Sequence, residues 1–106
     1  MIQYGAEQAT EFTFQQYRAS IEPRDNQWVD VELRFELKPG CELPVELTDL
    51  TALLICTRTG DIFQIVPQDE GRDCEFQFTE AEKVQLRLYY DMQVKPRLLQ
   101  LVKSEA

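Results

Sequence analysis

The sequence predicts an all-β domain, an antiparallel β-sandwich of about seven short strands with one short helical turn. In residues 28–37, WVDVELRFEL, apolar and polar side chains alternate without interruption. This pattern is typical of a strand with one buried face. Turn residues, such as Lys38-Pro39-Gly40, separate the apolar segments at intervals of roughly ten to twelve residues. At residues 86–95 the alternation continues in place of a helical period.

The first half of the chain divides at its turn residues. Residues 11–18 alternate weakly and predict a first strand, and Pro23 with Asp25-Asn26 predicts a turn over 21–27. The strand at 28–37 follows. Pro44 restricts the next segment, 41–47, to an edge or a connection.

The second half begins with a hairpin. Residues 51–58, TALLICTR, are apolar on both faces and predict a central strand, which pairs with IFQIV across a turn at 59–61. A polar loop at 67–73 precedes a strand at 74–78. We expect two further strands, at 86–95 and 98–102, separated by a bend at Pro96.

A helical turn is expected between the last strands. Thr79 and Glu82 have the spacing of a capping box, in which each side chain bonds to the other residue's amide. Residues 80–85 are too few for a stable isolated helix, so we interpret them as a structural crossover between the two sheets of the sandwich.

The alternation also predicts the core. We expect the following side chains to be largely buried: Val29, Val31, Leu33, Phe35, Leu53, Ile55, Phe76, Phe78, Leu88, Tyr90 and Met92.

Length and charge limit the function. A chain of 106 residues predicts a single domain over 1–106, and leaves open whether residues 1–10 form a flexible arm. The net charge of −8 disfavours nucleic-acid phosphates and anionic membranes as partners. No apolar run is long enough for a membrane span, and the N-terminus lacks the pattern of a signal peptide. The three cysteines suggest a reducing cytosol, although pairing of Cys41 with Cys74 stays open.

The residue types predict no enzyme, no cofactor and no metal site. The chain has no histidine and no closely spaced cysteine pair, which argues against the common nucleophile systems and zinc. Residues 69–73, DEGRD, lack the ligand pattern of a calcium loop, so we interpret them as a solvated loop. Carboxylate pairs such as Glu80 and Glu82 are explained by the start of the helical turn. The aromatic residues Tyr17, Trp28, Tyr89 and Tyr90 could line a sugar or peptide site, but packing explains them better.

From Trp28 onward the order of elements resembles a known family. The strand WVDVELRFEL leads through ELPVELTDLTALLI into the hairpin TALLICTRTGDIFQIV. CEFQFTEAEKVQL, RLYYDMQVK and RLLQLVKSEA follow. This order is similar to the small immunoglobulin-like domain at the N-terminus of phage baseplate upper proteins, which also occurs as short proteins of phage and prophage tail clusters.

The resemblance implies a virion structural protein, made in the host cytoplasm, that acts as a tail or baseplate adaptor or attachment module. Its partners would be other tail and baseplate proteins, in a homo-oligomer or multi-copy assembly. The alternative is a small acidic phage-encoded inhibitor, of the anti-CRISPR or DNA-mimic type, directed at a host defence protein. The charge of −8 is the feature that favours it.

Two segments are candidate partner-binding edges. The weakly alternating N-terminal segment and the apolar C-terminal segment could each add a strand to a neighbouring protein. We expect the contacts from six side chains: Phe12, Phe14, Tyr17, Leu98, Leu99 and Leu101.

Overall fold

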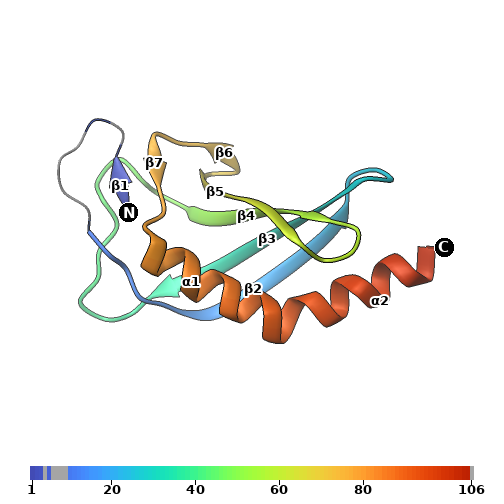
Figure 1. Ribbon diagram of the computed structural model, residues 1–106. Helices are drawn as coiled ribbons and strands as arrows, with labels where there is room; N and C mark the ends of the chain where they lie inside the picture. The colour runs from blue at the N-terminus through green and yellow to red at the C-terminus, as the bar shows by residue number, and fades with distance from the viewer. Residues whose placement is uncertain (4, 6–9, 106) are drawn as a thin grey trace.

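The computed structural model describes residues 1–3, 5 and 10–105 and shows an antiparallel sheet with a long helix across one face (Figure 1). The strands are β1 (Ile2–Gln3), β2 (Phe14–Pro23), β3 (Trp28–Leu37), β4 (Leu50–Thr57), β5 (Ile62–Asp69), β6 (Arg72–Asp73) and β7 (Phe76–Gln77). They form a five-stranded sheet of order β2-β3-β4-β5-β6 and a two-stranded sheet of β1 and β7. The chain is thus mostly antiparallel β-structure, as its sequence predicts.

The hairpins lie close to where turn residues place them. The β2–β3 turn is fixed by Asp25, whose Oδ1 accepts from the amides of Gln27 and Trp28, each at 2.8 Å. β4 lies in the middle of the sheet, between β3 and β5, so the prediction of a central strand at 51–58 is confirmed. The segment 41–47 forms no strand and belongs to the β3–β4 loop, where Leu47 is buried. All three cysteines are free.

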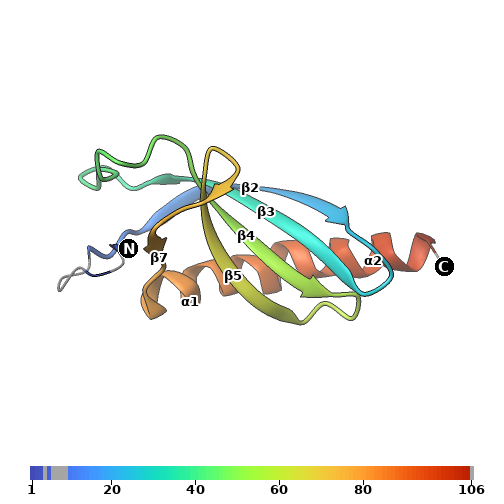
Figure 2. The same cartoon turned by 90° about the horizontal axis from the view of Figure 1, so that it is seen from above.

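The expected strands at 86–95 and 98–102 are wrong, because both segments are helical. α1 (Glu80–Tyr89), the π-helical turn η1 (Tyr90–Val94) and α2 (Lys95–Glu105) follow one another without a break. The helical turn predicted at 80–85 is therefore the start of a long helix and not a crossover between sheets. Figure 2 shows this helix running behind the five-stranded sheet, where it forms the second layer.

The four-residue spacing of the buried side chains explains why the sequence predicts strands where the chain is helical. The buried side chains of the helix recur at every fourth residue: Glu82, Leu86, Tyr90, Val94 and Leu98. A second apolar row, offset by two residues, is exposed: Val84 is 52%, Leu88 57% and Met92 70% exposed. Two residues along an α-helix rotate by about 200°, so the rows lie on opposite faces. Read together, two rows of period four with an offset of two look like the period of a strand.

The π-helical turn keeps the buried row on the sheet. Each step of four residues overshoots a full α-helical turn by about 40°, so the row would drift by about 160° between Glu82 and Leu98 in a straight α-helix. The amide of Lys95 donates to the carbonyl of Tyr90, five residues earlier, which makes a wider turn. This wider turn removes part of the drift.

The core lies between the helix and the inner face of the sheet. Val29, Val31 and Leu33 of β3 are fully buried, as the alternation predicts. The neighbouring strand contributes Ala52, Leu54 and Cys56. The burial of the other predicted core residues depends on the helix and on the fact that the helix covers only one face of the sheet. Phe76, Phe78 and Tyr90 are buried as expected, Phe35, Leu53 and Ile55 are only partly buried, and Leu88 and Met92 are exposed.

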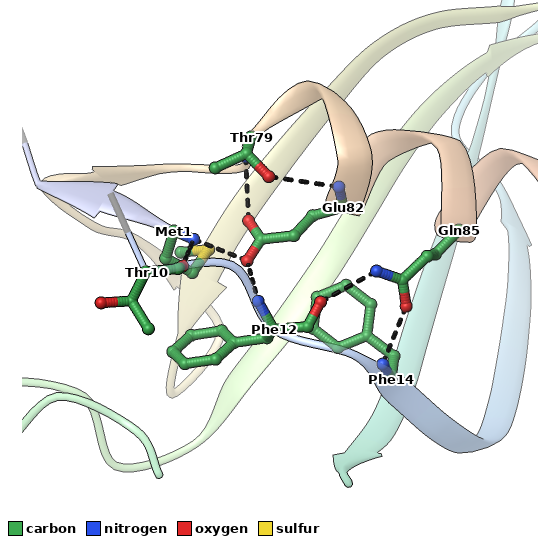
Figure 3. Close-up of polar contacts among 7 residues, drawn as sticks. All are labelled: Met1, Thr10, Phe12, Phe14, Thr79, Glu82 and Gln85. Carbon is green, nitrogen blue, oxygen red and sulfur yellow. Dashed lines mark hydrogen bonds and ion pairs between the residues drawn. The ribbon is translucent and has the colours of Figure 1, made fainter. Parts of the chain in front are cut away.

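The capping box is confirmed, and its glutamate has a wider role (Figure 3). The Thr79 hydroxyl accepts from the Glu82 amide at 3.2 Å, and Glu82 Oε1 accepts from the Thr79 amide at 2.9 Å. Glu82 Oε2 accepts from the α-amine of Met1 at 2.6 Å and from the Phe12 amide at 2.8 Å. The amine also donates to the carbonyl of Thr10. Glu82 and Met1 are almost completely buried, so this ion pair lies inside the protein.

Gln85, one turn further on, continues this connection. Its side-chain Nε2 donates to the carbonyl of Phe12 at 2.8 Å, and its Oε1 accepts from the Phe14 amide at 2.9 Å (Figure 3). Of residues 1–10, for which the sequence leaves a flexible arm open, Met1 is buried and Ile2–Gln3 pair with β7. Residues 4 and 6–9 lie outside the described residues.

Truncation of the two helix rows should have unequal effects. Leu86→Ala should lower the free energy of unfolding by roughly 2–5 kcal/mol, because Leu86 is fully buried. Leu88→Ala, the matched control on the opposite face, should change it by less than about 0.5 kcal/mol. Urea unfolding followed by circular dichroism measures both. Equal losses would support a strand at 86–95 and contradict the helix.

Substitution of the two capping-box residues should lower the free energy of unfolding by different amounts. Thr79→Ala should cost about 1 kcal/mol, because it removes one cap bond. Glu82→Gln should cost roughly 3–5 kcal/mol, because it leaves a buried amine without its counter-charge. Glu80→Gln is the control, since Glu80 is 84% exposed in its pair with Lys83. If Glu82→Gln unfolds at the same urea concentration as Glu80→Gln, the buried ion pair does not stabilise the fold.

Candidate functional site

The six residues predicted to bind partners do not form one surface. Phe12 and Phe14 are buried in the core, and the Tyr17 ring stacks on Tyr89 with the centroids 4.3 Å apart. These three aromatic side chains anchor the start of β2 to the helix. They do not project from an exposed edge.

The three C-terminal residues lie on a helix and not on an edge strand. Leu98 is fully buried, Leu101 is partly buried, and Leu99 is 40% exposed. Strand addition at residues 98–102 therefore has no structural basis, because α2 already pairs its main-chain groups internally.

The edge of the sheet at β2 carries protective features. Its pairing with β3 shifts register between Gln15 and Arg18, and Gln16 has a left-handed backbone with φ of 55°. Arg18 and Glu22 place charges along the same strand. Bulges and charges are the usual means by which proteins prevent an edge strand from pairing with other chains.

The opposite edge, at β5, carries no charge between Ile62 and Gln68, and its register shift against β4 lies between Ile62 and Gln64. β6 pairs only with Gln68 and Asp69 at the end of β5, and no other described strand pairs with this side of residues 62–67. The segment from Ile62 to Gln68 contains no charged residue, in a chain that is 28% charged. An uncharged and unpaired edge of this length is a site for adding a strand.

The direction of the Pro67 carbonyl shows which main-chain groups are available. Cys74, which follows β6, donates its thiol to the Pro67 carbonyl at 3.7 Å, so this carbonyl points away from β4. Main-chain groups two residues apart in a strand point the same way. The amide and carbonyl of Ile65 therefore also face outward, and Pro67 itself supplies no donor.

A groove of about 670 Å³ runs along this edge. Its apolar lining comes from β4, β5 and the segment around β7: Leu53, Ile55, Phe63, Ile65, Val66, Pro67, Phe76 and Phe78. Phe63 is 68% exposed and packs against Trp28, with the ring centroids 5.0 Å apart. We call this hollow, together with the open edge of β5, the edge groove.

The edge groove is basic although the protein is acidic. Arg24, Lys83 and Arg87 line it with Asp73 as the one acid among its lining residues. Arg24 donates to both oxygens of Asp30, at 3.0 and 2.6 Å, and Lys83 lies 3.5 Å from Glu80 at the exposed start of α1. Arg87 forms no ion pair within the described residues. Lys83 and Arg87 are four residues apart and so lie on one side of the helix.

A smaller hollow of about 260 Å³ extends along the helix from Arg87 to Lys95. Gly60, in the β4–β5 turn, lies against this part of the helix with φ of 91°, and the Lys95 side chain would come within 3.0 Å of an added Cβ. The Tyr90 hydroxyl donates to the Gly60 carbonyl at 2.6 Å. These contacts hold the start of β5 at a fixed distance from the helix.

The other groups considered for chemistry have structural partners. Asp69 Oδ1 accepts from the amides of Thr48 and Asp49, at 3.0 and 2.7 Å, and so ties the β3–β4 loop to β5. These bonds lower the pKa of the Asp69 carboxyl. No three Cys, Asp or Glu side chains in residues 1–3, 5 and 10–105 lie close enough together to hold a metal ion. Within the same part of the chain, no helix has the length and apolar character needed to cross a membrane.

The sequence contains signals for the edge groove that a search for catalytic motifs does not use. The uncharged segment between Asp61 and Asp69 indicates the open edge. Lys83 and Arg87 form a basic pair at helical spacing. Only the position of the helix beside β5 shows that these two signals belong together.

Comparison with known proteins yields no relative. The sequence matches no protein-family model, and neither a curated protein nor a solved structure shows significant similarity to it.

Alkaline pH should lower the stability of the fold through two buried groups, Cys56 and Tyr90. Burial raises the pKa of the Cys56 thiol from 9.0 to about 11 and raises the pKa of the Tyr90 hydroxyl above its ordinary 10.0. Both groups stay neutral in the folded state, while the unfolded chain loses these protons from about pH 9 upward. The unfolded state then binds fewer protons, so stability should fall between pH 9 and 11.

Cys56→Ser in combination with Tyr90→Phe removes both ionisations and should flatten this fall. Urea midpoints measured at intervals from pH 7 to 11 give the dependence for the wild type and the double variant. A wild-type midpoint that rises over this range would contradict the assignment.

Proposed function

We propose that this chain is a non-enzymatic protein-binding module that accepts an extended segment of another protein along the open edge of β5. The observation on which this rests is the edge groove, where unpaired main-chain groups, exposed apolar side chains and basic side chains meet. Strand addition supplies affinity through main-chain hydrogen bonds and specificity through the pockets for alternate side chains.

As its setting we propose a phage or prophage tail or baseplate, where the chain acts as an adaptor present in several copies. The order of the sequence elements from Trp28 to β7 supports this proposal through the resemblance described above. The last two strands of that resemblance are helical in this protein, so the support comes only from the segment that contains β3 to β7.

The acidic-inhibitor alternative is less well supported by the distribution of charge. On the outer face of the sheet, Arg24 pairs with Asp30, and Arg34 pairs with Glu32 and Asp49. A mimic of nucleic acid needs free carboxylates in series. Here arginines neutralise the carboxylates at the centre of that face.

The test is incorporation into particles. A tagged full-length chain is produced while particles assemble in a host that carries its coding sequence, and purified particles are examined by mass spectrometry. The wild type should be present in several copies. Ile65→Pro should be lost, because proline removes an outward-facing donor from the edge while leaving the pairing with β4. Because Ile65→Pro also loses core packing, Phe63→Ala serves as a second variant.

Val45→Ala is the matched control, since Val45 is 91% exposed in the β3–β4 loop and does not line the edge groove. It should be incorporated like the wild type. Thermal unfolding confirms that each variant is folded. Particles without the wild-type chain would overturn the adaptor role. Folded Ile65→Pro and Phe63→Ala proteins that are incorporated like the wild type would overturn the role of the edge groove.

A further inference from the structure

We infer that the segment bound in the edge groove is an extended strand in which acidic and apolar side chains alternate. This inference rests on the proposed function, because it assigns the chemistry of the partner to the same site. It follows from three features of the groove: its open main chain, the different character of its two sides, and its local charge.

The open main chain sets the conformation of the partner. The outward-facing amide and carbonyl of Ile65 can pair only with a chain that runs beside β5 as a further strand. The groove is lined by β5 and by α1, so an extended segment that pairs with β5 would also contact the side chains of α1.

The two sides of the groove set the alternation. Ile65 pairs with Leu54, whose side chain is in the core, so Ile65 points toward the helix. On that side the added strand would meet Lys83 and Arg87. Val66 lies on the opposite face of β5, where Phe63 packs against Trp28. Side chains of a strand alternate between these sides, so one set faces Lys83 and Arg87, and the other set faces Phe63 and Val66, with Arg24 on the same outer side in its pair with Asp30.

Charge sets the identity of the polar set. The lining holds three basic side chains and one acid, in a chain that carries −8 as a whole, and two of the three, Arg24 and Lys83, are paired with Asp30 and Glu80 outside the lining. Arg87 has no ion pair within the described residues, so it is free for a partner's carboxylate. The rest of the surface is acidic and repels such a segment. Binding is therefore favoured in the edge groove and disfavoured elsewhere on the surface.

The experiment selects ligands without assuming their sequence. A library of random twelve-residue peptides, made by messenger-RNA display, is selected on the immobilised full-length chain. The strongest peptides are synthesised, and their Kd is measured by calorimetry. Enriched peptides should contain Asp or Glu at every second position with apolar residues between. Hydrogen exchange of the complex should show protection of the Ile65 amide.

Charge reversal provides the matched pair of variants. Lys83→Glu with Arg87→Glu should weaken binding of the selected peptide at least about tenfold, since two favourable contacts become repulsive. Arg97→Glu with Lys103→Glu makes the same change in net charge on the same helix, outside the groove, and should change Kd less than about twofold. A peptide with Lys in place of its acids should bind the Lys83–Arg87 variant better than it binds the wild type. Methylation of the peptide's main-chain nitrogens should abolish binding, because it prevents strand pairing.

The inference is overturned if no peptide is enriched, if enriched peptides lack the acidic alternation, or if both double variants weaken binding equally. It is also overturned if protection occurs away from β5. These failures differ from failure of the proposed function. Particles that incorporate the wild type but not Ile65→Pro would preserve the binding role while this ligand chemistry is rejected. Selection of acidic strands by a chain that is absent from particles would reject the adaptor role alone.

Discussion

The buried carboxylate of Glu82 is the constraint on which the arrangement of this protein depends. Its two oxygens accept from the Thr79 amide, the Phe12 amide and the Met1 amine, and so join the helix start to the chain that leads into β2. A carboxylate without these donors could not be buried at an acceptable free energy. The N-terminal segment and the helix are therefore each required for the burial of the other. Lys83 and Arg87 follow on the same helix, so the position of the groove's basic side depends on this contact as well.

The period of the helix determines what the rest of its surface can do. Because buried side chains recur every four residues, the helix needs the wider turn at η1 to keep them on the sheet. The row offset by two residues is then directed to solvent and remains apolar, from Val84 to Met92. Between these rows lies the row of Lys83 and Arg87, which faces the edge groove. One helix thus closes the core, supplies the charge of the groove and leaves an apolar face exposed.

The local parts of this fold could be predicted from the sequence, and the long-range parts could not. The strand at 28–37, the central strand at 51–58 and the capping box at Thr79 depend on neighbouring residues, and each is present in the structure. The helix beyond residue 85 could not be distinguished from a strand. Apolar residues at every second position fit a strand, and they also fit two apolar rows on opposite faces of a helix. The two cases differ only once one of these rows is known to be buried. That knowledge depends on the packing of the helix against β3 and β4, which brings together residues far apart in the sequence. Likewise, residues 62–67 are recognisable as a strand, but the strand order that leaves their outer side unpaired is a property of the whole sheet.

The two edges of the sheet differ in how readily another strand could pair with them. At β2, a bulge at Gln15–Arg18 and a left-handed residue distort the edge so that a regular strand cannot continue it. At β5, the register shifts between Ile62 and Gln64 and is then regular to Asp69, and the edge carries no charge before Asp69, while Pro67 removes one donor from it. An apolar open edge is a hazard for a protein that works alone, because copies can pair without limit. Here the basic side chains of the helix limit access to that edge: a second uncharged β5 would bring no carboxylate to Lys83 and Arg87, whereas an acidic strand would. In the proposed binding mode, the same residues that attract a partner would therefore disfavour self-association at this edge.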